Sequence, residues 1–278
     1  MTSFGRWSVL GSSTRGASHR ASGAPNQDAY AWRGIGDRAH PAVVAAIADG
    51  HGHQRHFRAE RGARIAVDQA CQRAADLEVQ SKDLDGADLG SFGRETLVPS
   101  ILGAWREAVA DDYRENTFTP REEEIRAAAN DDPVIAYGAT LIVTVLGQRW
   151  VLVAQIGDGD VVSIRADGSV EAPVPRDPLL DGRRTTSLCQ TTALGSFRIA
   201  VIDRRDPRLL ALLVATDGFA NAQVAEPWEP AVGADVATML LSHGPRWVGR
   251  RLPRWTARCA SSEGSGDDTT VVLAIGGP

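Results

Sequence analysis

The sequence predicts an α+β fold in which helices cover layers of antiparallel β-sheet. Strand-like runs occur near both ends of the chain and in its middle, and two long helical stretches follow one another after the third run. The β-rich runs in the middle are joined by short turns, as in hairpins. Helices that are grouped in this way favour an α+β layered domain over a doubly wound parallel sheet, in which helices and strands alternate.

The N-terminal part predicts three short strands, because apolar runs are separated there by Gly, Ser and Pro. These strands cover residues 7–10, 29–32 and 43–47. The third run is apolar throughout, which is typical of a strand that is buried on both faces. It is therefore expected inside a sheet and not at an edge.

The next part predicts helices. Residues 57–77 and 97–108 each carry apolar side chains at helical spacing, so each is expected to pack one face on a sheet. Between them, residues 81–93 are polar and contain glycine, which predicts a loop. Thr119 precedes a proline and stands three residues before a glutamate, the pattern of a capped helix start, and a short acidic helix is expected over 120–129.

The next part of the chain is rich in β-forming residues. Runs at 141–146 and 150–156 are joined at Gly147-Gln148, and runs at 161–164 and 169–171 flank an Asp-Gly turn. Both pairs are predicted hairpins.

The C-terminal part begins with a long loop. Residues 173–192 are rich in proline, arginine and threonine without periodicity, and loops of this length are often functional. Strands are expected at 199–202, 209–214 and 270–275, with helix around Val236 before the last of them.

Composition limits the class of protein. The chain has 278 residues with a formal charge of −5, which gives no overall attraction for nucleic acid or anionic lipid. Its three cysteines are isolated, so neither a disulfide framework nor a cysteine zinc site is expected. No basic and apolar leader and no run of about 18 apolar residues occurs, so we expect a soluble, cytoplasmic protein. No linker divides the chain, which predicts one domain over residues 1–278.

Three acidic motifs mark strand ends. Asp49 and Asp217 each follow an apolar β-run, and Asp267 precedes one. Carboxylates gathered at the ends of buried strands repel one another unless a cation lies between them. The pattern predicts bound metal ions and, with them, a metal-dependent hydrolase.

These motifs belong to a larger ordered set. In chain order the set is Asn26-Gln27-Asp28, Asp49-Gly50-His51-Gly52, Gly138-Ala139-Thr140, Ile156-Gly157-Asp158-Gly159, Ala215-Thr216-Asp217-Gly218 and Gly266-Asp267-Asp268-Thr269-Thr270. Its order and approximate spacing resemble those of the metal-dependent (type 2C) serine/threonine protein phosphatases, in particular their divergent bacterial-like branch. The resemblance spans about residues 8–275. It implies a four-layer α/β/β/α sandwich of two antiparallel sheets flanked by helices, with a helical insertion at about 78–135 and a flap-like loop at about 173–192.

The resemblance also implies a metal site and its ligands. Two divalent ions, Mn²⁺ or Mg²⁺, are expected between the sheets, with a weaker third ion. Asp49 resembles the bridging carboxylate, with the Gly50 carbonyl on one ion and Asp217 and Asp267 on the other. Asp28 resembles the acid that acts through metal-bound water, and Asp158 the ligand of the third ion. All-oxygen ligation of this kind suits hard ions better than zinc.

The implied reaction is hydrolysis of phosphoserine and phosphothreonine in proteins by attack of a metal-bridged hydroxide. Such ions deprotonate water near neutral pH and cancel phosphoryl charge. His51 matches the family's general acid, and a histidine can carry a proton near pH 7. The partner would be a phosphorylated protein, the target of a Ser/Thr kinase, with no nucleic acid and no membrane.

The chain departs from the family pattern at several positions. The arginine that usually grips substrate phosphate is missing from its place, and the nearest cations are Arg20 and, next to it, His19. Gln27 replaces a common acid, and Asp160 stands where an arginine is usual. Asp268 occupies a position that holds an amide in the family.

Two alternatives follow from the residues. Gln27 and the missing arginine favour a catalytically weak, phosphatase-like module that binds phosphoproteins. The His-x-His-x-x-His spacing of His51, His53 and His56 favours a zinc hydrolase of metallo-β-lactamase type, although Arg55 stands where that pattern requires an aspartate. For His53 and His56, solvated positions near a helix start are the simpler interpretation. For the arginines of residues 246–258, a solvated helix face is simpler than a docking surface for an acidic partner.

Overall fold

The computed structural model describes residues 2–37, 40–78, 86–175, 177, 180, 185–204 and 209–277. Its strands are β1 (Thr2–Phe4), β2 (Trp7–Thr14), β3 (Ala29–Ile35), β4 (Ala42–Ala48), β5 (Leu141–Leu146), β6 (Trp150–Ile156), β7 (Asp160–Arg165), β8 (Val170–Glu171), β9 (Arg198–Asp203), β10 (Leu209–Ala215) and β11 (Thr269–Gly276). Its helices are α1 (Ala17–Ser22), α2 (Ala59–Asp76), α3 (Gly86–Phe92), α4 (Val98–Glu115), α5 (Pro120–Ala129), α6 (Ala193–Ser196), α7 (Asp217–Ala220), α8 (Glu229–His243) and α9 (Pro245–Cys259). Short helical turns lie at η1 (Gln54–His56), η3 (Gly93–Leu97) and η4 (Pro133–Tyr137).

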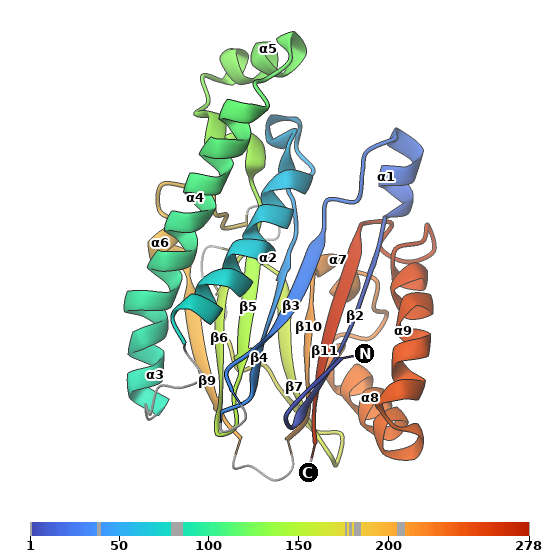
Figure 1. Cartoon of the computed structure of the whole chain (residues 1–278). Coiled ribbons are helices and arrows are strands. Elements are labelled where there is room, and N and C mark those ends of the chain that lie inside the picture. The colour runs from blue at the N-terminus through green and yellow to red at the C-terminus, as the bar shows by residue number, and fades with distance from the viewer. Residues whose placement is uncertain are drawn as a thin grey trace.

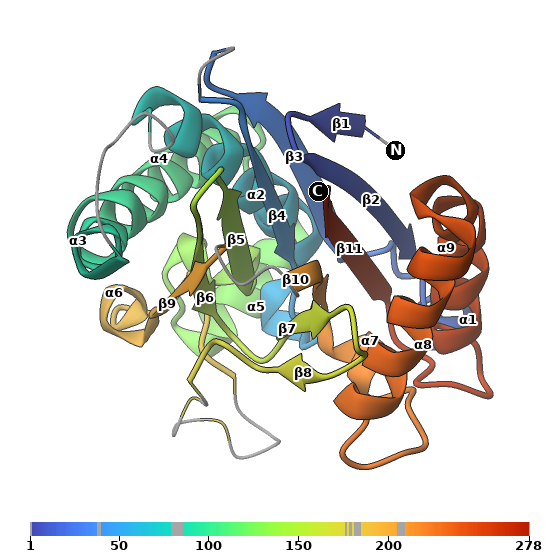
Figure 2. The ribbon, with the colours of Figure 1, turned by 90° about the horizontal axis from the view of Figure 1, so that it is seen from below.

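Within the described residues the strands form two antiparallel sheets. The six-stranded sheet has the order β1-β2-β11-β10-β7-β8, and the five-stranded sheet has the order β3-β4-β5-β6-β9. Figures 1 and 2 show the two sheets face to face, with α2, α3 and α4 outside the five-stranded sheet and α8 and α9 outside the six-stranded one. This arrangement confirms the predicted α+β sandwich.

Three hydrophobic cores hold the four layers together. The first lies between the five-stranded sheet and its helices, the second between the two sheets, and the third between the six-stranded sheet and α8 and α9. Strand β4 shows why its sequence is apolar throughout: Val43 and Ile47 enter the core between the sheets, whereas Val44 and Ala46 enter the core beneath the helices. Because both faces of this strand are covered, apolar side chains are favoured at each of its positions.

Most predicted elements are present. The periodic stretch at 57–77 forms α2, and the capping box at Thr119 and Glu122 starts α5. The predicted loop at 81–93 was wrong in its second half, because α3 occupies 86–92. Leu89 is buried there in the first core, so tertiary packing outweighs a glycine-containing sequence. Residues 79–85 lie outside the described part of the chain, as do several positions of the predicted flap.

The described residues contain no helix that is both long enough and apolar enough to cross a membrane.

Candidate metal centre

The strand register brings the predicted ligands to one end of the sandwich. In the five-stranded sheet Ala29 pairs with Ala48, so Asp28 just before β3 lies beside Asp49 just after β4. In the six-stranded sheet Ala215 pairs with Val271, so the residues that follow β10 lie beside those that precede β11. Because the strands of each pair are antiparallel, the end of one lies beside the start of the other, and each sheet contributes two acidic chain segments at a single edge.

A threonine joins the two edges. Thr216 Oγ1 donates to Asp28 Oδ2 at 2.9 Å and accepts from the Thr270 N–H at 2.9 Å. The Thr216 N–H also donates to the Thr270 carbonyl at 3.0 Å. Asp28 of one sheet is thereby fixed against the ends of β10 and β11 of the other, which brings acids from both sheets into one neighbourhood.

Two glycines allow the chain segments to approach this closely. A Cβ on Gly218 would lie 2.0 Å from the Asp268 carbonyl oxygen, and one on Gly50 would lie 2.8 Å from the carbonyl oxygens of Gln27 and Ala59. Any side chain at either position would push Asp217 or Asp49 out of place. The glycine after each of these aspartates is therefore required by packing.

The carboxyl groups influence one another strongly. Asp49 keeps part of its surface in contact with solvent, yet burial of its carboxyl raises its pKa well above the usual range, and the charges of Asp28, Asp217 and Asp267 raise it further. Burial likewise raises the pKa of Asp28 to about 8, with added repulsion from Asp268 and Asp217. The pKa of Asp217 is also raised, chiefly by burial. The acids thus share a low-dielectric region that disfavours their negative charge.

The donor set fits a hard divalent cation. Asp28 Oδ1, Asp217 Oδ1 and Gln27 Oε1 are buried and have no hydrogen-bond partner. These oxygen atoms are acceptors, so a cation would satisfy them and remove the repulsion between the carboxylates. No group of three or more His, Cys, Asp or Glu side chains in the described ranges is already arranged to hold a metal ion.

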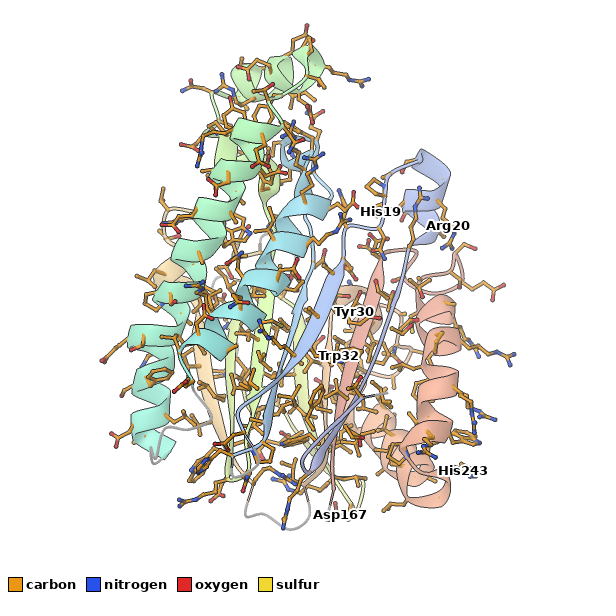
Figure 3. The ribbon with its side chains drawn as sticks, viewed as in Figure 1. His19, Arg20, Tyr30, Trp32, Asp167 and His243 are labelled. Carbon is orange, nitrogen blue, oxygen red and sulfur yellow. The ribbon has the colours of Figure 1, made fainter. Side chains whose placement is uncertain are left out.

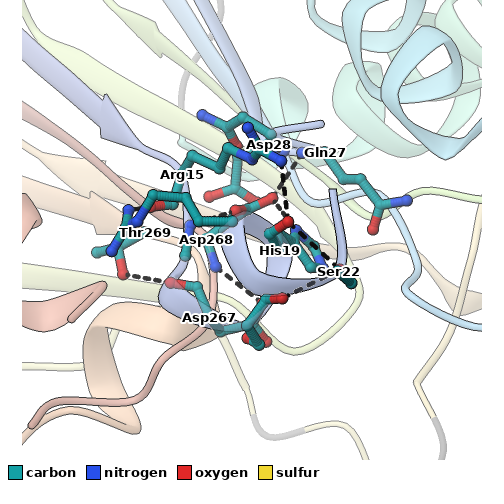
Figure 4. A network of polar contacts seen from close by, with 12 residues as sticks. Arg15, His19, Ser22, Gln27, Asp28, Asp267, Asp268 and Thr269 are labelled. Atoms are coloured by element: carbon teal, nitrogen blue, oxygen red, sulfur yellow. Dashed lines mark hydrogen bonds and ion pairs between the residues drawn. The ribbon is translucent and has the colours of Figure 1, made fainter. Parts of the chain in front are cut away.

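Asp268 connects the surrounding segments, as Figure 4 shows. Its buried carboxylate accepts from the Gly16 N–H at 2.6 Å, the Gln27 N–H at 2.6 Å and His19 Nδ1 at 2.8 Å. Asp268 therefore holds the segments around Gly16, His19 and Gln27 together. Sequence reasoning did not identify its partners, since they lie about 250 positions away in the chain and nothing in their spacing indicates contact.

The two cations predicted to bind phosphate have other partners. His19 faces Asp268, and only 17% of its side chain is exposed. Arg20 is exposed, and its guanidinium donates to the backbone carbonyls of Arg15 and Ala260. Figure 3 shows both residues at the end of the molecule where α1 lies. Both side chains are therefore engaged, but the two bonds of Arg20 use only two of the five N–H donors of its guanidinium.

His51 lies next to the acids on a constrained backbone. Its N–H donates to the Gly138 carbonyl at 3.1 Å, and its ring meets that of His56 edge to face at 4.9 Å. Burial, helped by the neighbouring His56, lowers the pKa of His51 to about 4. The expectation of a readily protonated imidazole near pH 7 therefore does not hold for the protein without bound ions. His56 differs from its predicted solvated state, because it is half-buried and its Nδ1 contacts the Ile135 carbonyl at 2.5 Å.

Asp158 occupies the edge of this acidic region. Burial raises its pKa, while a hydrogen bond from Thr185 and the charge of Arg198 oppose the rise. The adjacent Asp160 has its pKa raised to about 7 by burial and by the charges of Glu229, Asp217 and Asp158. Arg198 of β9 thus places a positive charge near Asp160, the position at which the family pattern has an arginine. Sequence reasoning missed this residue, since β9 is about 40 positions away.

The comparisons with known proteins agree with this geometry. The sequence model of the family described as Protein phosphatase 2C matches residues 15–253. No curated protein is significantly similar to the sequence.

Solved structures share the fold at low sequence identity. The PstP/Ppp serine/threonine phosphatase of Mycobacterium tuberculosis is 16% identical with a TM-score of 0.57, over 98% of this chain and 99% of that chain. Stp1 of Staphylococcus aureus is 14% identical with a TM-score of 0.61, over 99% and 95%. A PstP catalytic domain in complex with two manganese ions is 18% identical with a TM-score of 0.58, over 98% and 99%. The family match covers most of the sequence, and the chain belongs to the protein phosphatase 2C family of serine/threonine phosphatases.

Proposed function

We propose that this protein hydrolyses phosphoserine and phosphothreonine in proteins by attack of a hydroxide held between two divalent ions. The observation that supports the proposal most is the set of mutually raised pKa values of Asp28, Asp49 and Asp217, together with the unpaired buried oxygens of Asp28 and Asp217. Acids kept this close in a low-dielectric region require a cation to be ionised at neutral pH.

The ions would be held by Asp49, the Gly50 carbonyl, Asp217 and Asp267, with Asp28 acting through water. When bound, Mn²⁺ or Mg²⁺ would supply the nucleophile and neutralise charge on the phosphoryl oxygens. The manganese ions of the PstP structure support the same choice of metal here. Asp158, with Asp160 beside it, would serve a weaker third ion.

The chain's own residues prepare this reaction. Thr216 holds the Asp28 carboxylate against the second sheet, and Gly218 keeps Asp217 close to the Asp268 backbone. His51 would donate the proton to the leaving seryl or threonyl oxygen, which is strongly basic and leaves poorly as an anion. Because burial lowers the pKa of His51 to about 4, its imidazole would have to take up a proton before this step. Arg20 would bind a phosphoryl oxygen with its remaining N–H donors.

The proposal is tested with purified protein and Mn²⁺. Wild-type protein should release phosphate from a phosphothreonine peptide and from p-nitrophenyl phosphate, and Asp49→Asn and Asp217→Asn should abolish both activities. Asp111→Asn, an exposed change on α4, is the control and should retain them. The assay covers about pH 6 to 9, the range of the relevant titrations. The proposal would be contradicted by folded wild-type protein that releases no phosphate with any divalent metal in this range.

A binding module without turnover is the second candidate. It is favoured by one observation, the engagement of His19 and Arg20 by other groups. Calorimetry separates the two functions, because a binding module retains phosphopeptide without releasing phosphate. The zinc hydrolase is not favoured, because His53 is exposed and His56 Nδ1 contacts the Ile135 carbonyl.

A further inference from the structure

A row of arginines follows one face of α9. Arg246, Arg250, Arg254 and Arg258 stand four residues apart, and all four are exposed. Residues four apart lie on one face of a helix, and a rise of about 1.5 Å per residue makes the row roughly 18 Å long. These four residues are called the arginine stripe below.

No acidic residue of α9 itself balances this charge. Residues 245–259 contain no Asp or Glu, and no stripe arginine forms an ion pair with an acid elsewhere in the described ranges. Some exposed arginines on other helices have such partners, as Arg64 has Glu60 on α2 and Arg114 has Asp111 on α4. Like charges four residues apart destabilise a helix by tenths of a kcal/mol each. The stripe therefore gathers four exposed like charges on one helix face without an ion pair among the described residues.

The opposite face of α9 is already used. Val248, Leu252 and Thr256 are buried against the six-stranded sheet, and Thr256 Oγ1 is hydrogen-bonded to Ser12 Oγ at 2.9 Å. A helix that binds a lipid surface needs a free apolar face to insert. Because α9 has none, its arginines fit a polar, anionic partner better than a membrane.

The stripe leads toward the candidate metal centre. The Ala260 carbonyl at the end of α9 accepts from the Ala17 N–H of α1 at 2.8 Å and from the Arg20 guanidinium at 3.5 Å. The same short helix carries His19, whose partner is Asp268. Figure 1 shows α9 running along the outside of the sheet with its C-terminal end near α1. Arg258 is thus the stripe residue nearest to the centre.

We propose that the arginine stripe binds an acidic segment of the phosphoprotein substrate and so directs the phosphorylated residue to the metal centre. This inference rests on the proposed function. An 18 Å row, by the estimate above, corresponds to about five or six extended residues, so the partner is a short run of Asp or Glu beside the phosphorylated residue. The overall charge of −5 repels such a segment, which makes a local basic row the element that orients it.

The test compares two variants with the same net charge. The stripe variant is R246Q/R250Q/R254Q/R258Q. The control is R33Q/R64Q/R114Q/R121Q, which removes four exposed arginines from other elements; each variant lowers the formal charge from −5 to −5 − 4 = −9. Circular dichroism and thermal unfolding first establish that both variants are folded.

Two phosphothreonine peptides of equal length serve as substrates. One carries six Glu beside the phosphorylated residue and the other carries six Gln, because a run of about six extended residues spans the stripe. In the stripe variant KM for the Glu peptide should rise about tenfold at low ionic strength, with kcat and the turnover of p-nitrophenyl phosphate unchanged. The difference should largely vanish at about 0.5 M salt, where exposed charges are screened. The control variant and the Gln peptide should show little change.

Equal KM values for the Glu peptide in the stripe and control variants would overturn the inference. Fluorescence anisotropy of a labelled Glu peptide gives a readout that does not depend on catalysis. If wild-type protein binds this peptide and the stripe variant does not, the inferred docking surface is supported. If the protein at the same time releases no phosphate, only the proposed function is contradicted. If the stripe is needed instead for binding phosphatidylserine vesicles or duplex DNA, and not for the peptide, the inference is wrong.

Discussion

His19 Nδ1 lies 2.8 Å from Asp268 Oδ2, and this pair connects α1 to the segment that precedes β11. The other bonds of the carboxylate come from the Gly16 and Gln27 N–H groups, so three chain segments meet at a single buried side chain. Two of these segments continue directly into the proposed ligands Asp28 and Asp267. The geometry of the metal centre therefore depends on a residue that is not itself proposed as a ligand.

Replacing Asp268 should disturb both stability and metal binding. Hydrogen bonds to a buried charged group contribute about 1.5 to 3 kcal/mol each, so Asp268→Ala should lower the free energy of unfolding by at least about 2 kcal/mol. Asp268→Asn keeps the shape and part of the hydrogen bonding, and should cost less. Urea unfolding gives the stability, and calorimetric titration gives the affinity for Mn²⁺. Asp111→Asn serves as the control, and equal stability of Asp268→Ala and wild type would refute the role.

The metal-free protein should lose stability as pH rises. The folded pKa of Asp28 is raised to about 8 and that of Asp49 is raised as well, so the folded state binds protons more tightly than the unfolded chain does. That stabilisation is complete below the ordinary Asp pKa of about 4 and is lost progressively as pH rises toward about 8. Thermal unfolding with a chelator should show Tm falling across this range, and Mn²⁺ should restore it most at the alkaline end. A Tm that stays constant with the chelator, or no response to Mn²⁺, would contradict the proposed site.

Gly218→Ala should weaken metal binding through backbone displacement. The new Cβ would lie 2.0 Å from the Asp268 carbonyl oxygen, so α7 and its first residue Asp217 must move. Overpacking of this kind costs about 1 to 3 kcal/mol. Gly103→Ala on α4 is the matched control, because no atom lies within 4 Å of its added Cβ. That control should stabilise the helix by about 0.5 to 1 kcal/mol. Unchanged Mn²⁺ affinity in Gly218→Ala would show that this contact does not position Asp217.

His51→Gln should affect substrates according to their leaving group. A general acid contributes about 10² to 10⁴ to the rate when the leaving oxygen is strongly basic. Turnover of a phosphothreonine peptide should therefore fall by about that factor, whereas p-nitrophenyl phosphate, with its much less basic leaving group, should lose far less. His53→Gln, at an exposed position, is the control. Equal losses for both substrates would assign His51 a structural role and not proton donation.

The sequence was most informative where local pattern and tertiary environment agree. The apolar run of β4, the periodic face of α2 and the capping box of α5 were all predicted, since burial and hydrogen bonding at these places follow from neighbours in the chain. The helix α3 was missed, because Leu89 finds its apolar partners in distant elements. The division into one domain with a helical insertion and a flap stays a prediction.

For the proposed metal centre, the sequence by itself supplied the candidate residues. It supplied carboxylates at strand ends, each followed or preceded by a glycine, and the ordered motifs of the family. These features are local, so they can be read without the fold.

Only the tertiary structure decided how those residues are held. The register of β3 against β4 and of β10 against β11 placed the acids at one edge, and Thr216 joined the two sheets there. The tertiary structure also pairs His19 with Asp268. It leaves the α9 arginines exposed and without acidic partners in the described ranges. Charge interaction and desolvation depend on distance in space and on surrounding atoms, and neither is encoded in the separation of residues along the chain.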